Sequence, residues 1–309
     1  MLVIDGSHLE GGGQIVRSAV ALSALTCTPV RIEHIRAGRQ QPGLRPQHLA
    51  AVGAVAAACN ATVTGCTTGS QEIEFFPGCI SSHEIAIDVG TAGSIPLVIQ
   101  AWLPVAIQLG GVLTLTGGTE VERSPSIDYF TNVLVPFLGM HGARISVEIT
   151  RRGYYPRGGG LVKVEVKPSV LNRLSTDCQR PGGDRGICSC SAGLPAHVAK
   201  RQANAAASHL SRRMGLEFPV TVDIRPGPGT GSSCTVWRGW MGGTGLGKRG
   251  YPAERVGEDA ALALVREWEG DGLVDLAVFF QKLGGVALRF GVIVAVRRNG
   301  FVKADRFFG

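Results

Sequence analysis

The stretch that decides the fold is DGSHLEGGGQIVRS, residues 5–18, which follows the short apolar run Leu2-Val3-Ile4 and leads into an amphipathic run at residues 15–25. This order predicts a strand, a glycine turn and a helix. Three successive glycines, Gly11 to Gly13, permit backbone angles that are closed to other residues and let an anion approach the main chain. The free N–H groups and the dipole of the following helix favour negative charge at the same place.

A second segment, RAGRQQPGLRPQH at residues 36–48, adds Arg36, Arg39 and Arg45. The planar guanidinium group suits phosphate oxygens better than the lysine ammonium does. A purely structural turn would also explain the triple glycine, but it would not explain the arginines that follow. The two segments together therefore predict a pocket for a phosphorylated ligand.

The pattern around Asp5 occurs a second time. From Ala86 the chain reads AIDVGTAGSIPLVIQAWLPVAIQLGGVLTLTGGTE, which again gives a strand ending in Ile-Asp, a glycine turn, an apolar helix and an alternating strand. The second halves also match, because helices near residues 47–59 and 127–140 precede strands near residues 61–63 and 143–145, and a strand pair follows in each. The sequence therefore predicts an α/β fold (α+β layers) with repeated βαβαββ units, in which apolar sheet faces pack against helices.

A change of composition marks the end of this repeat. Around residues 168–186 the chain becomes polar and rich in glycine, proline and arginine, which is typical of a domain boundary. Residues 187–268 then indicate a small α/β insert, with helices near residues 196–214 and 253–268 and strands near residues 220–224 and 234–237. We expect a repeat domain at residues 1–180, an insert domain at 181–268 and a remnant of a third copy at 269–309.

Length and composition favour a folded intracellular protein. The chain has 309 residues, of which 44% are hydrophobic, enough for a sizeable core. No apolar run reaches the about 18 residues that a membrane helix needs, and the start, MLVIDG, has no basic stretch or cleavage site. The eight cysteines are scattered, only Cys188 and Cys190 lie close together, and no zinc-type CxxC pairs occur. We therefore expect reduced thiols, a cytoplasmic location and no membrane partner.

The charge favours an anionic partner. The net charge is +7, and the first lysine is Lys163, so every earlier basic residue other than histidine is arginine. A GC-rich genome would produce the same preference for arginine. Aromatic residues make up only 6%, which argues against an extended stacking platform for single-stranded RNA. Recognition of a chain end fits this composition better than recognition of a long sequence.

The two opening segments resemble the signature of the RNA 3'-terminal phosphate cyclases, and the resemblance covers roughly residues 1–270. Five further motifs carry it: GTAGSIPLVIQ (90–100), GGTEVERSPSIDYF (117–130), RGYYPRGGG (152–160), LPAHVAKRQ (194–202) and GPGTG (227–231). The family implies repeated βαβαββ units like those of enolpyruvylshikimate-phosphate synthase, with a small insert that interrupts the third copy.

The resemblance also implies a reaction, that of a ligase in RNA processing. Family members use ATP and a divalent metal, Mg or Mn, to convert an RNA 3'-terminal phosphate into a 2',3'-cyclic phosphodiester. A histidine takes AMP and passes it to the RNA phosphate, and the neighbouring 2'-hydroxyl then displaces AMP. This chemistry requires a nitrogen nucleophile, cations that neutralise the phosphates and strict positioning of the hydroxyl.

The family motifs assign roles to eight residues of this chain. ATP and its phosphates are expected at Glu10, Gln14, Arg17, Gln100 and Gln281, the RNA phosphate at Arg36, Arg39 and Gln47, and the metal at Glu10. Taken by itself, Glu10 could also be a helix-capping carboxylate, and Gln100 a hydrogen-bonding group of the core. Leu9 departs from the family, which usually has glycine in this slot.

Histidines in this part of the chain do not match the family's nucleophile. His48 and His197 lie in segments that resemble family motifs, whereas His141 does not. We expect all three to be structural residues.

The resemblance breaks near the end of the chain. The family's nucleophile belongs to a late H-x-x-x-N motif, and the nearest match here is Ala295-Val296-Arg297-Arg298-Asn299, which places Ala295 in the nucleophile slot. No histidine follows His209. The preceding L-A-D-Q motif is matched only at Gln281, in Val278-Phe279-Phe280-Gln281. Alanine can neither attack ATP nor hold AMP, so the usual route is closed at this position.

Several explanations of this ending stay open. The gene's last part could carry a frameshift or sequencing error, the gene could be decaying, or the chain could be a folded, catalytically silent homologue that kept RNA binding. The functional hypotheses are accordingly an ATP-dependent cyclase whose active form ends differently, and a silent RNA-binding relative. A sugar-phosphate transferase of the synthase type is disfavoured, because the matched motifs are those of cyclases.

Overall fold

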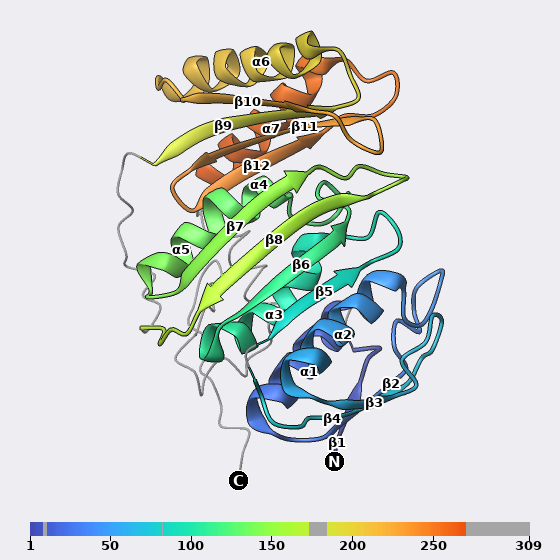
Figure 1. Ribbon diagram of the computed structural model, residues 1–309. Helices are drawn as coiled ribbons and strands as arrows, with labels where there is room; N and C mark the ends of the chain where they lie inside the picture. The colour runs from blue at the N-terminus through green and yellow to red at the C-terminus, as the bar shows by residue number, and fades with distance from the viewer. Residues whose placement is uncertain (9–10, 82, 173–183, 270–309) are drawn as a thin grey trace.

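The computed structural model describes residues 1–8, 11–81, 83–172 and 184–269 (Figure 1). Within them, three four-stranded sheets follow one another along the chain, each with helices packed against it. The first layer consists of β1 (Leu2–Asp5), α1 (Gln14–Thr26), β2 (Val30–Glu33), α2 (Pro46–Cys59), β3 (Thr62–Thr64) and β4 (Ile73–Phe76). Its strands lie in the order β1-β2-β4-β3.

The second layer repeats this topology. It consists of β5 (Glu84–Asp88), α3 (Ile95–Leu109), β6 (Gly111–Gly117), a helical segment, β7 (Arg144–Arg151) and β8 (Gly160–Lys167), with strand order β5-β6-β8-β7. In both layers the first two strands are parallel and the other pairings are antiparallel. The predicted α/β fold with repeated βαβαββ units is therefore confirmed for these two copies.

The insert has a different topology. It contains β9 (Arg185–Ala192), α6 (Ala196–Met214), β10 (Val220–Arg225), β11 (Gly231–Arg238), β12 (Met241–Leu246) and α7 (Ala253–Glu269), in the strand order β10-β9-β11-β12. Figure 1 shows it stacked on the end of the molecule next to β7 and β8. The boundary predicted near residue 180 and the third copy at 269–309 lie almost wholly outside the described residues, so the division into domains stays a prediction.

The helices of the two repeat layers share one hydrophobic core. Helices α1, α2 and α3 contact one another, and a single cluster of buried side chains extends from Val16 on α1 to Val166 on β8. On α1, Val16, Val20 and Ala24 are buried with a spacing of four, which places them on one face of the helix. Trp102 of α3 is among the largest fully buried side chains. The core therefore fixes the strand ends from which the glycine turns emerge.

Two local differences from the predicted elements have physical reasons. Helix 127–140 forms, but as α4 (Ile127–Tyr129), a π-helical turn η1 (Phe130–Leu134) and α5 (Val135–Met140). Pro136 explains this, because proline has no N–H to donate and its ring crowds the preceding turn.

Strand β12 was not predicted from the sequence, because its glycines resemble those of a loop. A Cβ at Gly243 would lie 2.1 Å from the carbonyl oxygen of Ala260, so glycine is what lets α7 pack directly on this strand.

A buried ionic network joins the second layer to the insert. The guanidinium of Arg152, which follows β7, donates to Glu120 at 3.0 Å, to both oxygens of Asp128 at 2.7 and 3.0 Å, and to Asp223 of β10 at 2.9 Å. The side chain of Arg152 is 2% exposed. Removal of one partner from such a network leaves an uncompensated buried charge.

Candidate anion-binding site

The glycine turn after β1 prepares an open helix N-terminus. Gly11 has φ +53°, in the left-handed region that favours glycine, and its N–H donates to the carbonyl of His8 at 3.0 Å. Helix α1 begins at Gln14, with Gly13 as its N-cap, no side-chain cap and no acidic residue in its first turn. Among the described residues, the first N–H groups of α1 therefore lack a side-chain acceptor, which is the arrangement that binds anions.

Arg17 lies one turn into α1 and is buried. Its Nη2 donates to Oε1 of Gln14 at 2.8 Å, and Nε2 of Gln14 donates in turn to Ser18 at 2.9 Å. Burial lowers the pKa of Arg17 to about 10, so the side chain stays charged near neutral pH. Its Nε has no hydrogen-bond partner among the described residues. A buried cation with an open donor is stabilised by an anion brought next to it.

The arginine segment folds back onto the glycine turn. Arg36 has φ +55°, and its Nη1 donates to the carbonyls of Gln41 and Gly43, at 2.8 Å in each case. Arg39 reaches the turn, since a Cβ built on Gly12 would lie 3.7 Å from its Nη2. Burial and the neighbouring charges of Arg45 and Arg39 lower the pKa of Arg36. Like charges held this close favour a shared anion.

His48 lies at the centre of this group. It is 3% exposed on α2, its Nδ1 accepts from the backbone N–H of Arg45 at 3.0 Å, and a Cβ on Gly13 would lie 2.0 Å from its Nε2. Burial, with Arg17, Arg36 and Arg45, lowers its pKa to about 3, so the imidazole is neutral near pH 7. Because Nδ1 accepts, the proton of the neutral ring is on Nε2, beside the glycine turn.

From the sequence alone, His48 is expected to be structural and Arg45 has no role separate from the other arginines. One local feature of the sequence points to His48. This residue is the third of α2, after the N-cap Arg45, and a side chain at this position can bond back to the N-cap backbone. That bond sets the tautomer, but the closeness of Gly13 depends on packing between α1 and α2. His141 is buried and packs edge-on against Phe137, and His197 is exposed on α6.

Two of the four glutamines predicted from the family motifs, Gln47 and Gln100, lie in different surroundings. Oε1 of Gln47 accepts from the backbone N–H of Ser94 at 3.2 Å, so it links the arginine segment to the glycine turn of the second layer. Gln100 is 3% exposed on α3, within the core. Nucleotide contact at Gln100 and RNA contact at Gln47 stay predictions. Glu10, Leu9, Gln281 and Ala295 lie outside the described residues, and so does the predicted metal position at Glu10.

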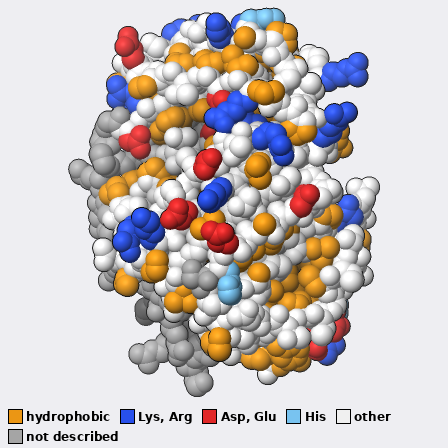
Figure 2. Space-filling view, in the orientation of Figure 1, with side chains coloured by type: hydrophobic (Ala, Val, Ile, Leu, Met, Phe, Trp, Pro, Cys, Tyr) orange, Lys and Arg blue, Asp and Glu red, His pale blue; other side chains and the backbone are white. Residues whose placement is uncertain are grey.

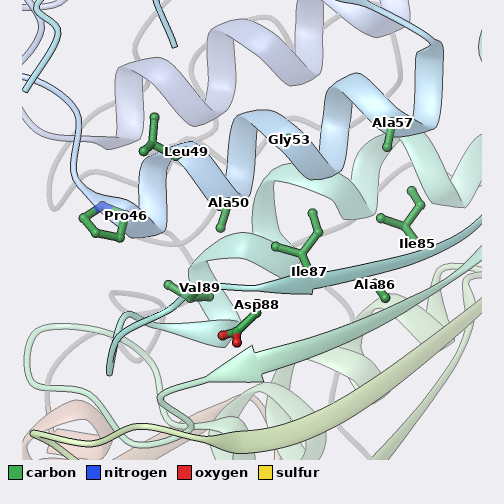
Figure 3. Close-up of a pocket in the computed structure, with 10 residues that line it drawn as sticks. All are labelled: Pro46, Leu49, Ala50, Gly53, Ala57, Ile85, Ala86, Ile87, Asp88 and Val89. Atoms are coloured by element: carbon green, nitrogen blue, oxygen red, sulfur yellow. The ribbon is translucent and has the colours of Figure 1, made fainter. Parts of the chain in front are cut away.

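An apolar concavity lies between α2 and β5, apart from the glycine turn. It measures about 460 Å³ and is lined mainly by apolar side chains, including Leu49, Ala50, Ile85 and Ile87, with Asp88 as its only charged residue (Figure 3). Figure 2 shows hydrophobic side chains gathered over this part of the surface. A groove with this lining does not suit a phosphate.

No helix in the described part of the chain is long and apolar enough to cross a membrane.

The chain matches known proteins over most of its length. Residues 8–293 match the family described as RNA 3'-terminal phosphate cyclase. Proteins of that name from Archaeoglobus fulgidus and Thermococcus kodakarensis are 42% and 44% identical to it, over 94% and 99% of this chain and 88% and 92% of their own lengths. The protein of the same name from Caldivirga maquilingensis is 47% identical over 85% of this chain and 78% of its own length. This chain therefore belongs to the RNA 3'-terminal phosphate cyclase family.

Proposed function

We propose that the glycine turn and the arginine segment bind the 3'-terminal phosphate of an RNA chain, for the ATP-dependent formation of a 2',3'-cyclic phosphodiester that the family resemblance implies. One observation carries this proposal. The charges of Arg17, Arg36 and Arg45 act on the buried His48 beside an uncapped helix N-terminus, and none of these three arginines forms a salt bridge with a carboxylate among the described residues. A phosphate monoester supplies the missing negative charge.

Each group has a distinct task in this proposal. The guanidinium forks offer paired donors to phosphate oxygens, and the N–H groups at the start of α1 offer a positive dipole end. Nε2–H of His48 adds a neutral donor, whose bond does not depend on a proton taken up from solution. The resulting fixed orientation would hold the 2'-hydroxyl close to the phosphorus atom, which is the main requirement of an intramolecular displacement.

ATP and a divalent metal belong to the same proposal. The family reaction activates the phosphate with AMP from ATP, and Gln14, Arg17 and Gln100 are the described residues whose motifs imply ATP contact. The metal, Mg or Mn, is expected at Glu10. Arginines and a neutral histidine are poor ligands for these hard cations, so the residues described around the turn would hold phosphate rather than metal.

A second hypothesis is a catalytically silent homologue that retains only RNA binding. What favours it is the motif comparison, which predicts Ala295 in the slot of the nucleophile. Both hypotheses require the same phosphate site, and they differ only in AMP transfer. Binding and AMP transfer must therefore be measured separately.

The direct test of the site compares two RNA oligonucleotides that differ only at the 3' end. By fluorescence anisotropy at fixed salt, the 3'-phosphorylated RNA should bind at least about tenfold more tightly than the 3'-hydroxyl RNA, equivalent to about 1.4 kcal/mol. Equal affinities would show that the site does not read the phosphate. The affinity for a 5'-phosphorylated RNA of the same sequence distinguishes recognition of the 3' end from a general attraction to one additional phosphate charge.

The neutral state of His48 predicts a pH dependence of stability. Its pKa is about 3 in the folded protein and 6.5 for an ordinary histidine, so between these values the unfolded chain binds a proton that the folded chain does not. The free energy of unfolding should therefore fall as pH drops below about 6.5, by up to about 1.4 kcal/mol per pH unit from this residue. Urea unfolding between about pH 7.5 and about pH 5 measures it.

The matched control is the exposed His197. The slope should be shallower in His48→Gln than in the parent, and unchanged in His197→Gln. The same slope in all three proteins would mean that His48 titrates normally in the folded state.

A further inference from the structure

Two cysteines and an aspartate meet where the insert packs on the second layer. Cys188 and Cys190 are two residues apart on β9, so their side chains share one face of the strand. That face is turned to Asp128 of α4. The three residues are 8%, 0% and 3% exposed, respectively. The sequence shows that the two cysteines are close together, but it does not show that the Asp128 carboxylate lies beside both thiols.

The distances within this group are close enough for the three side chains to ligate one metal ion. The two Sγ atoms are 3.5 Å apart, Sγ of Cys188 lies 3.6 Å from Oδ1 of Asp128, and Sγ of Cys190 lies 3.4 Å from Oδ2. Zinc bonds of about 2.3 Å to sulfur and about 2.0 Å to oxygen place tetrahedral ligands about 3.8 Å apart for two sulfurs and about 3.5 Å for sulfur and oxygen. The two sulfur-to-oxygen distances involve different oxygens of Asp128, so a carboxylate that binds through one oxygen must turn, or one thiol must move, to reach this geometry. One ligand atom from each residue already lies within 4.8 Å of the other two.

The surroundings of Asp128 resemble the support of a ligating carboxylate. Arg152 donates to both of its oxygens, at 2.7 and 3.0 Å, and this fixes the orientation of the carboxylate. Each oxygen has a second lone pair that can face a metal while the first accepts from arginine. Glu120 shares Nη1 of the same arginine through Oε1, it is 3% exposed, and its Oε2 has no hydrogen-bond partner among the described residues.

We propose that Asp128, Cys188 and Cys190 form a zinc site that joins the insert to the second repeat layer. These three side chains supply three of the four ligands of a tetrahedral zinc ion. The donor set separates this site from the Mg or Mn of the family reaction, because thiolates select zinc and other soft or borderline metals over hard ones. Its ligands come from two segments about 60 residues apart, so bound zinc would fasten the two units together.

The alternative arrangement has the same atoms without metal. Two protonated thiols can each donate a weak hydrogen bond to Asp128, at the distances found here. This arrangement predicts no uptake of a thiophilic metal, and the two possibilities therefore differ in a measurable property.

Cobalt(II) is the spectroscopic probe of choice. The full chain, reduced and stripped of metal with a chelator, is titrated anaerobically with Co²⁺. A zinc-type site gives a thiolate-to-cobalt charge-transfer band in the near ultraviolet and strong visible bands of tetrahedral cobalt, saturating at one cobalt per chain. Zn²⁺ should abolish these bands and raise Tm, whereas Mg²⁺ should leave the cobalt spectrum unchanged.

Matched cysteine variants assign the spectrum to this site. The double variant Cys188→Ser/Cys190→Ser should lose both the charge-transfer band and the rise in Tm on zinc addition. The double variant Cys27→Ser/Cys79→Ser removes two exposed cysteines elsewhere and should keep both. If the first double variant does not fold, Cys188→Ser alone should weaken the band.

The parent chain alone can overturn the proposal. A folded, fully reduced parent that shows no thiolate-to-cobalt band, or no rise in Tm with zinc, would establish the two thiols as hydrogen-bond donors to Asp128. A band that survives in Cys188→Ser/Cys190→Ser and disappears in Cys27→Ser/Cys79→Ser would place metal binding at the exposed cysteines and would equally exclude this site.

Discussion

Incubation of this 309-residue chain with labelled ATP is expected to give no covalent AMP adduct on denaturing electrophoresis. The family resemblance implies that a histidine nitrogen is the nucleophile of AMP transfer, and the motif comparison predicts Ala295 in its slot. A methyl group has no lone pair to attack phosphorus, and no histidine follows His209 along the chain. The effect is expected to be complete, because the covalent step has no partial substitute in this segment.

The control for this experiment is a family relative treated in parallel. The Archaeoglobus fulgidus protein, which carries the cyclase name and is 42% identical, should form an acid-labile adduct under the same conditions. An adduct of the same stability on the present chain would contradict the prediction, and peptide mass spectrometry would then locate the residue that carries AMP. Modification of His48, for example, would place the nucleophile at the glycine turn.

The outcome also separates the two functional hypotheses. With phosphate-end binding present and no adduct formed, the chain behaves as a silent RNA-binding homologue. Resequencing the last part of the gene adds an independent result. A histidine restored in frame would favour the cyclase, and a confirmed Ala295 would favour the silent homologue.

Substitution of Arg39 by alanine is expected to weaken binding of 3'-phosphorylated RNA by about 1.5–3 kcal/mol, the range of a charge-assisted hydrogen bond, or roughly 10- to 150-fold. Arg39 is the arginine of the second segment that reaches the glycine turn, beside Gly12. The loss of one phosphate contact should also reduce the slope of log affinity against log salt by about 1. Titrations at several salt concentrations give both quantities.

Three comparisons sharpen this test. Arg144→Ala removes an exposed arginine on β7, away from the glycine turn, and should leave affinity nearly unchanged. With 3'-hydroxyl RNA, Arg39→Ala should have a much smaller effect. Arg36→Ala should also weaken binding, but Arg36 donates to two backbone carbonyls of its own loop, so its Tm has to be measured beside its affinity. Unchanged affinity and salt slope in Arg39→Ala would contradict the proposed phosphate site.

The repeat could be predicted from the sequence because its signals are local. Apolar periodicity, Ile-Asp at a strand end and a glycine turn before a helix all lie within short stretches, and the helix predicted at residues 196–214 agrees with α6 (Ala196–Met214). Strand β12 could not be predicted, because its glycines are needed for close packing against α7, which comes later in the chain. Glycine at such positions allows another element to pack closely, and the neighbouring residues in the sequence do not show which element that is.

The sequence by itself determined the α/β repeat, and it predicted the arginine-rich phosphate motifs and the alanine in the nucleophile slot. Only the tertiary structure decided how distant groups meet. It placed His48 against the glycine turn, where burial and the charges of nearby arginines lower its pKa, and it brought Asp128 to the thiols of β9. The physical reason is the range of the interactions. Periodicity and turn chemistry act over a few neighbouring residues, whereas burial, charge environment and ligand geometry depend on packing between elements that the sequence keeps apart.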